Sequence, residues 1–310
     1  MTGCIDRRTV LRAGIGAAVG LSGLRPMGAL AAADPVVTPL SEQLHLISGV
    51  GGNVLALWGD EGFLLVDSGA PSQVKRLQGS LKSLAKGAQV RTVINTHWHL
   101  DQTGGNDGFG RAGAKIIAHA KAQQRMATPQ YLPKEDRYLA PRNKEAVPTS
   151  VFYDKGKLDF AGETIEYGYL LEPHTDGDLY VYFPKANVLA VGGAASPDQD
   201  PQLAWFEGGW LGGRVDALAK LLQIGNEQTK IIAATGPVIS RAELKTEREA
   251  LDTVFTRMSE AIRKGLGTED MQRANILDGL ARTWANPDQF IYDAHKGMWA
   301  HHNTLSHQIV

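Results

Sequence analysis

The sequence has almost no cysteine, and this absence limits the chemistry of any site that the chain builds. The one cysteine among 310 residues is Cys4, close to the amino terminus. The segment that contains Cys4 has the features of a removable export signal, so the mature chain would hold no disulfide and no thiolate ligand. Any metal site in the remainder must therefore use histidine, aspartate or glutamate side chains.

Charge excess, internal repeats and long apolar runs are also absent from the sequence. The formal net charge is −1 at pH 7, which gives no electrostatic reason to expect nucleic acid or an anionic membrane as a partner. A hydrophobic content of 43% with 21% charged residues is typical of a soluble globular protein. The length suffices for one large domain or two small ones.

The first 33 residues have the pattern of a twin-arginine export signal. Arg7 and Arg8 precede a weakly apolar run over residues 13–24, and alanines at 29 and 31–33 form a small-residue cleavage site. A disordered basic tail, the alternative, would need neither feature. The run is too short and too rich in glycine for a stable membrane anchor. We therefore expect residues 1–33 to be a signal peptide and the mature protein to reside in a bacterial periplasm.

The strongest functional signal lies between Val93 and Asn106. A short apolar stretch, typical of a buried strand, leads into His97, His99 and Asp101, which are spaced two residues apart. In an extended segment such side chains project to the same side, so all three would converge beyond the strand end. Two imidazoles at one point suit Zn²⁺. The alternative is a polar turn, which the position between a strand and a Gly-Gly turn disfavours.

This segment resembles the signature of the metallo-β-lactamase superfamily, Thr-His-x-His-x-Asp-His. The resemblance continues over residues 62–69, 174–178, 180–184 and 231–244. One departure lies inside the signature, because Gln102 stands where most members have a zinc-binding histidine. The resemblance implies an α/β fold, the four-layer αββα sandwich. Periodicity alone indicates only an α/β or α+β fold.

The resemblance also implies a set of metal ligands. The first family site is matched by His97, His99 and His174, and three histidines leave a fourth zinc position for water. The second site retains only Asp101. Its other three ligands are matched by residues that hold zinc poorly, namely Gln102, Gly193 (or Ala194) and Thr235. We therefore expect one Zn²⁺ per chain.

The expected activity follows from this single site. We expect a periplasmic hydrolase in which a zinc-bound hydroxide attacks an acyl bond of a β-lactam, a lactone or an ester. Asp101 would orient that hydroxide or act as general base, and Gln102 would hydrogen-bond the substrate or water. The alternative is a non-catalytic relative that keeps one structural metal. The partner would be a small-molecule substrate, and the oligomeric state stays open.

The remaining patterns predict the organisation of the chain. We expect the metallo-β-lactamase domain over residues 34–240 and a helical extension over 241–310 that packs on it. Helices are predicted over residues 71–85, 214–224, 240–264 and 268–284. Residues 128–150 contain four prolines and little periodicity, which predicts a loop. This loop would be either a wall of the ligand site or a passive crossover.

Three other features are assigned structural roles. Asp67, at a strand end, is expected to brace the metal-site loops. His119 also follows a strand, where a lone histidine is more often packed than metal-bound. The histidines near the carboxyl terminus include the adjacent pair His301 and His302, whose side chains point apart on any regular element. They are expected to belong to the packed extension rather than to a metal site.

Overall fold

The computed structural model describes residues 34–133 and 136–306, the last five by their backbone alone. The predicted export signal, the side chain of His302 and all of His307 lie outside the described residues. Within the described ranges, no helix combines the length and the apolar character that are needed to cross a membrane.

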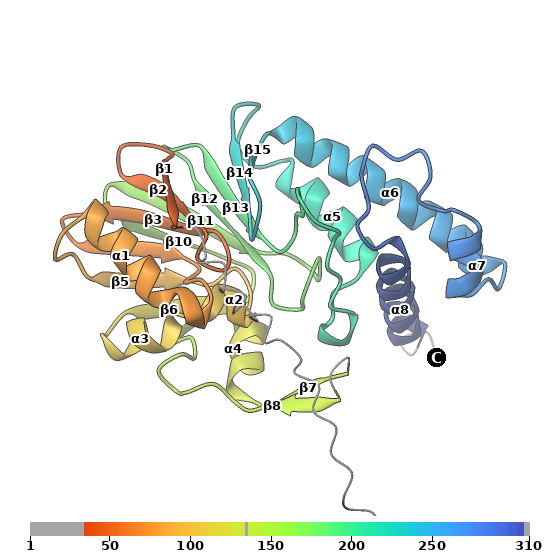
Figure 1. Cartoon of the computed structure of the whole chain (residues 1–310), viewed down its shortest axis with the longest axis horizontal. Helices are drawn as coiled ribbons and strands as arrows, with labels where there is room; N and C mark the ends of the chain where they lie inside the picture. Colours follow the sequence, from red (N-terminus) through yellow and green to blue (C-terminus); the bar gives the residue numbers. More distant parts are fainter. Residues whose placement is uncertain (1–33, 134–135, 307–310) are drawn as a thin grey trace, which may run out of the picture. The chain divides into compact units, whose positions relative to one another are not determined.

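Two β-sheets form the centre of the domain (Figure 1). The first has seven strands in the order β1 (Val36–Pro39), β2 (Leu44–Ser48), β3 (Val54–Gly59), β4 (Gly62–Val66), β5 (Val90–Ile94), β6 (Lys115–His119) and β9 (Ser150–Phe152). The second has six strands in the order β10 (Lys155–Phe160), β11 (Glu163–Tyr169), β12 (Leu179–Phe183), β13 (Val188–Gly192), β14 (Lys230–Ala233) and β15 (Val238–Ile239).

The sheets bury their central strands on both faces. Every residue of β4 and of β13 is buried, which explains why these strands have no alternation of apolar and polar residues. One core lies between the sheets and contains Leu55, Ile94, Ile165 and Val181. β4, β5 and β6 run parallel to one another, and β13 runs parallel to β14. The carboxyl ends of the strands in each set therefore lie at the same end of their sheet.

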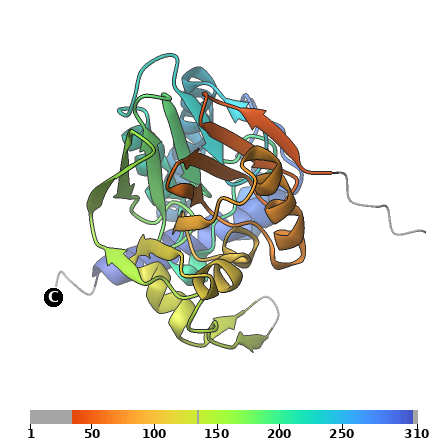
Figure 2. The same cartoon turned by 90° about the vertical axis from the view of Figure 1, so that its left-hand side faces the viewer.

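Helices cover the outer face of the first sheet. Figure 2 views the domain from this side, with α1 (Val74–Leu84) and α3 (Asn106–Arg111) in front of the strands. Leu77 and Leu81, one turn apart on α1, pack with Phe63 and Phe109 in a second core. A 3₁₀ turn, η1 (Pro71–Gln73), precedes α1. Two short helices, α2 (Leu100–Thr103) and α4 (Ala120–Ala127), follow β5 and β6.

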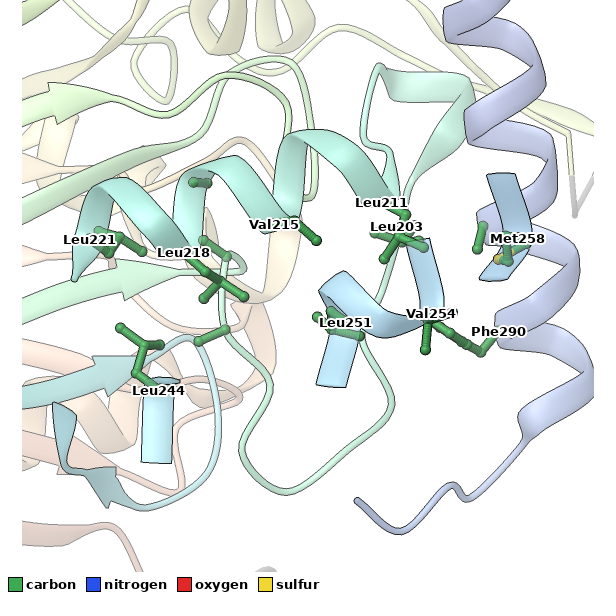
Figure 3. Close-up of a cluster of buried hydrophobic side chains, with 14 of the residues drawn as sticks. Leu203, Leu211, Val215, Leu218, Leu221, Leu244, Leu251, Val254, Met258 and Phe290 are labelled. Atoms are coloured by element: carbon green, nitrogen blue, oxygen red, sulfur yellow. The ribbon is translucent and has the colours of Figure 1, made fainter. Parts of the chain in front are cut away.

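The outer face of the second sheet packs on α5 (Leu211–Leu221) and α6 (Arg241–Arg263). Figure 3 shows Leu211 of α5 near Val254 of α6, with Phe290 of α8 (Pro287–Ser306) next to Val254. The helical carboxyl-terminal segment thus shares one core with the sheet. The order helix, sheet, sheet, helix confirms the predicted four-layer α/β sandwich, whereas the predicted domain boundaries stay a prediction.

The predicted helix over 240–264 is confirmed, and two other helix predictions need correction. Ser240 caps α6 with a full capping box to Glu243. The helix predicted over 268–284 ends early, because α7 covers only Thr268–Arg273. Asn275 then takes a positive φ of 51°, which ends the helix. In addition, α5 begins at Leu211, three residues before the predicted start.

The sequence analysis also missed two sets of strands. Residues 128–150 contain a two-stranded hairpin, β7 (Gln130–Leu132) and β8 (Arg137–Leu139), where a loop was expected. β10 went unnoticed because its charged and polar residues alternate with only a few apolar ones. The described residues of the hairpin do not line the two cavities that contain the predicted metal-site histidines.

Candidate metal centre

The loop after β5 carries two of the predicted ligands, and Asp67 fixes its conformation. The Thr96 backbone N–H donates to Asp67 Oδ1 at 2.8 Å, and the Thr96 hydroxyl donates to Oδ2 at 2.7 Å. Burial raises the pKa of Asp67 to about 8, although the hydrogen bonds from Thr96 oppose the rise. Asp67 itself has a φ of +63°, a conformation that aspartate tolerates better than most residues. Its contacts fit the predicted bracing role.

A second buried carboxylate arranges the loop that presents His174. Asp178 Oδ2 accepts the backbone N–H groups of His174 at 2.8 Å and of Thr175 at 2.7 Å. The Thr175 hydroxyl donates to the other carboxylate oxygen. Burial raises the pKa of Asp178 to about 7 against these hydrogen bonds. The loop turns back on itself here, which directs the histidine toward the first sheet.

The three predicted histidines come together at one point. His97, His99 and His174 each place a ring nitrogen within 4.8 Å of the others, and they are the group of potential metal ligands found among the described residues. Their ring centroids lie 4.8–5.0 Å apart, with the ring planes close to perpendicular. His97 and His174 are buried, and His99 is partly exposed.

Two of the imidazoles are oriented by neighbours in their own half of the domain. His97 Nδ1 lies 3.1 Å from the Thr96 hydroxyl, and His174 Nδ1 lies 2.8 Å from the carbonyl oxygen of Gln202. Because a carbonyl accepts only, His174 carries its proton on Nδ1 and presents the lone pair of Nε2. His174 Nε2 in turn lies 3.1 Å from His99 Nδ1.

His99 is oriented by Glu207, a residue that the sequence analysis missed. His99 Nε2 lies 2.6 Å from Glu207 Oε2, and the glutamate is buried. A carboxylate on the remote nitrogen of a ligand histidine fixes the ring and strengthens the metal bond. Glu207 lies in the 3₁₀ turn η2 (Trp205–Glu207), far from His99 in sequence. The sequence feature that could have indicated this role is that Glu207 is a single acidic residue between Trp-Phe and Gly-Gly.

The pKa shifts of the histidines differ in direction. Burial lowers the pKa of His97 and of His174 well below the ordinary value, and the neighbouring imidazoles contribute to both shifts. Burial also acts to lower the pKa of His99, but the hydrogen bond and the charge of Glu207 outweigh it and raise that pKa. His97 and His174 are therefore held neutral, the form in which histidine binds a metal.

Asp101 and Gln102 lie beside the histidines in different environments. Asp101 is in the first turn of α2 and not in an extended segment, so the geometric argument from strand spacing was wrong for it. Asp101 still lines a cavity of about 290 Å³ together with all three histidines. Gln102 is fully buried, and its amide donates to Asp101 Oδ2 at 3.3 Å and to the carbonyl oxygen of Ala234 at 3.4 Å.

The positions matched to a second metal site hold other groups. A Cβ atom on Gly193 would lie 2.3 Å from His174 Cδ2, so a larger side chain there would displace the histidine. The Thr235 hydroxyl accepts a hydrogen bond from Gln199 at 2.9 Å. The Gln102 amide lies so close to Gly52 that a Cβ there would be 2.1 Å from Nε2. Gly193 and Thr235 also line the cavity, but of the described second-site positions only Asp101 offers it a carboxylate.

His119 and His301 make packing contacts away from the metal centre. The His119 ring stacks on Tyr169 with centroids 4.0 Å apart, and its Nε2 approaches the carbonyl oxygen of Tyr153. The His301 ring stacks on Trp210 at 3.7 Å and lies 3.9 Å from a Glu172 oxygen. Neither belongs to the histidine cluster, as the sequence analysis expected.

A larger cavity of about 510 Å³ adjoins His99 and His174. One wall is the segment 199–207, and the other consists of residues 285–293, at the start of α8. A volume of this size suits a small organic molecule. Its lining includes Gln202 and Glu207, the partners of the outer ring nitrogens of His174 and His99.

Comparison with known proteins identifies the relatives of this chain. Residues 47–236 match the family model described as the metallo-beta-lactamase superfamily. The hydroxyacylglutathione hydrolase of Erythrobacter litoralis is 31% identical over 137 residues, which is 42% of this chain and 46% of that protein. The chain spans less than half the length of the curated relatives it matches.

Two solved structures illustrate the likeness in fold. The metallo-beta-lactamase from Pontibacter korlensis has a TM-score of 0.58 at 20% identity, covering 70% of this chain and 99% of that chain. The stereoselective inverting sec-alkylsulfatase from Pseudomonas has a TM-score of 0.63 at 14% identity, covering 86% of this chain and 50% of that chain. At these identities the likeness shows the fold alone.

The contact between His99 and Glu207 leads to a first prediction. Glu207→Gln should weaken metal binding about 10–100-fold, because an amide holds the ring without the charge that strengthens His99 as a ligand. Competition with a chromophoric chelator measures the affinity. Glu166→Gln, on the exposed side of β11, is the matched control and should leave the affinity unchanged. Equal affinity of Glu207→Gln and wild type would remove Glu207 from the metal site.

Proposed function

We propose a function from one premise: this chain belongs to the metallo-β-lactamase superfamily. We infer that it is a hydrolase that uses one Zn²⁺ held by His97, His99 and His174. The supporting observation is that each imidazole has one nitrogen engaged by the protein while the other faces its two neighbours. Nitrogen ligands of this number and spacing suit Zn²⁺ and leave a coordination position open.

Bound zinc would supply Lewis-acid chemistry, polarising an acyl carbonyl and lowering the pKa of water. The chain itself contributes a base. The Asp101 carboxylate lines the same cavity as the three histidines, so it is placed to accept the proton of an attacking water. Gln102 donates to Asp101 Oδ2 and is fully buried, which fits a residue that positions Asp101 better than one that touches the substrate.

The size of the cavity limits the class of substrate. The cavity beside His99 and His174 has room for a β-lactam, a lactone or an ester with a short chain. The alternative is a binding protein with one structural metal. It draws support from the second-site positions, where Gln102, Gly193 and Thr235 replace metal ligands.

We further propose that residues 1–33 direct export to the periplasm and that residues 34–240 and 241–310 are the catalytic domain and its extension. Arg7→Lys combined with Arg8→Lys should leave the chain unprocessed in the cytoplasm, because the twin-arginine route reads this pair. Cell fractionation and immunoblotting measure the outcome. Arg12→Lys is the control. Processed periplasmic protein from the double variant would refute this route.

The metal content gives a third prediction. The purified protein should hold about one tightly bound equivalent of zinc, since Asp101 is the one metal ligand left at the second-site positions. His99→Ala should lose nearly all of it, whereas Thr235→Ala should retain it. Elemental analysis after dialysis measures both. Two tightly bound equivalents in the wild type would contradict the single-site proposal.

The role of Asp101 gives the fourth prediction and the test of the function. The wild type should hydrolyse at least one member of a panel of lactams, lactones and esters. Asp101→Asn should reduce kcat by about 10²–10⁴-fold while zinc content stays the same, because asparagine keeps the size but accepts no proton. A rate within twofold of wild type would exclude Asp101 as the base. Absence of turnover on the whole panel would favour the binding protein.

A further inference from the structure

The wall of the larger cavity is fixed by contacts between the segment 199–207 and the carboxyl-terminal extension. The Asp200 carboxylate accepts the backbone N–H groups of Ala285 at 3.0 Å and of Asn286 at 2.7 Å, just before α8 begins. Arg282 donates to the carbonyl oxygens of Ser196 and Gln199. These hydrogen bonds join the extension to the segment that contains Glu207. Residues 285–293 of the extension are thereby held as one wall of the cavity.

The charges that line this cavity are of one sign. Asp200, Glu207 and Asp293 contribute carboxylates, and Asp101 adds a fourth in the adjoining cavity. Among the described residues that line these two cavities, none is a lysine or an arginine. The remaining walls are amides such as Gln289 and apolar side chains such as Phe206 and Phe290.

The two arginines behind the cavity, Arg214 and Arg282, hydrogen-bond to protein groups. Arg214 is fully buried, and its Nη atoms donate to the carbonyl oxygen of Gly193, the Ser196 hydroxyl and Glu247. Arg282 Nη2 is taken up by two backbone carbonyls. Both groups thus stabilise the loop behind the cavity. Among the described lining residues, no ammonium or guanidinium group is available to pair with an anionic ligand.

We propose, on the basis of the hydrolase function above, that this site takes uncharged or positively charged acyl compounds and rejects those with a second, carboxylate group. A carboxylate placed among like charges is repelled, and the loss of its hydration is not compensated by a cationic partner. The preferred substrate is an ester or lactone whose apolar part lies against Phe206 and Phe290. Hydrolysis adds water across the acyl–oxygen bond and releases a carboxylic acid and an alcohol.

Three matched phenyl esters test this selectivity on the zinc-loaded, full-length protein. Their acyl chains have equal length and end in a methyl, a carboxylate or a trimethylammonium group. We expect kcat/KM for the carboxylate ester to be at least about tenfold below that for the methyl ester, with the cationic ester equal or better. Equal or faster hydrolysis of the carboxylate ester would overturn the inference.

The corresponding N-phenyl amides are titrated by calorimetry in parallel, so the charge preference is measured even without turnover. If no ester is hydrolysed, the proposed function fails, while weaker binding of the carboxylate amide still supports the inference. Equal binding of the carboxylate and methyl amides would overturn it.

A charge variant locates the discrimination in this cavity. Gln289→Lys places an ammonium group on the cavity wall at an exposed position of α8, so folding should not suffer. The ratio of carboxylate to methyl ester kcat/KM, or of the matching amide affinities, should rise about tenfold. Gln228→Lys, the same change on the exposed turn before β14, should leave the ratio unchanged. An unchanged ratio in Gln289→Lys would show that the cavity charges do not set the selectivity.

Discussion

The candidate metal centre depends on the hydrogen bonds from Thr96 to the buried carboxylate of Asp67. These two contacts join the ends of β4 and β5, and the chain can then present His97 and His99 in a fixed turn. Leaving one partner of a buried hydrogen bond unsatisfied costs about 1–3 kcal/mol. A loop conformation that broke these contacts would be less stable by about that amount. Asp178 does the same for His174. The histidines therefore meet because two carboxylates organise the loops beneath them.

The local parts of this site could be predicted from the sequence, and the long-range part could not. His97 and His99 are close in sequence and follow an apolar strand, and His174 was found through a family resemblance. Glu207 is separated from His99 by more than a hundred residues, so its partner is determined only by the packing of η2 against the loop. Asp101 was placed correctly at the cavity, but by an argument about extended chain that does not apply to a helical turn.

The same distinction explains the errors in the fold. Ser240 and Glu243 encode the start of α6 locally, and the helix begins where they predict. The segment after α7 also has helical composition. It forms a turn instead, and Arg257 of α6 stabilises this turn by donating to the carbonyl oxygens of Ile276 and Asp278. Tertiary contacts of this kind outweigh weak helix propensity, which is worth less than about 1 kcal/mol per residue.

The cavity beside the histidines is built by two parts of the chain, the segment 199–207 and the start of α8. The histidines lie within the stretch that matches the family model, residues 47–236, whereas residues 285–293 of the cavity wall lie outside it. The other wall, residues 199–207, lies inside that stretch, so the cavity is shared between the family domain and the extension. Substitutions at residues 285–293 would alter one wall of the cavity and leave the three histidines in place.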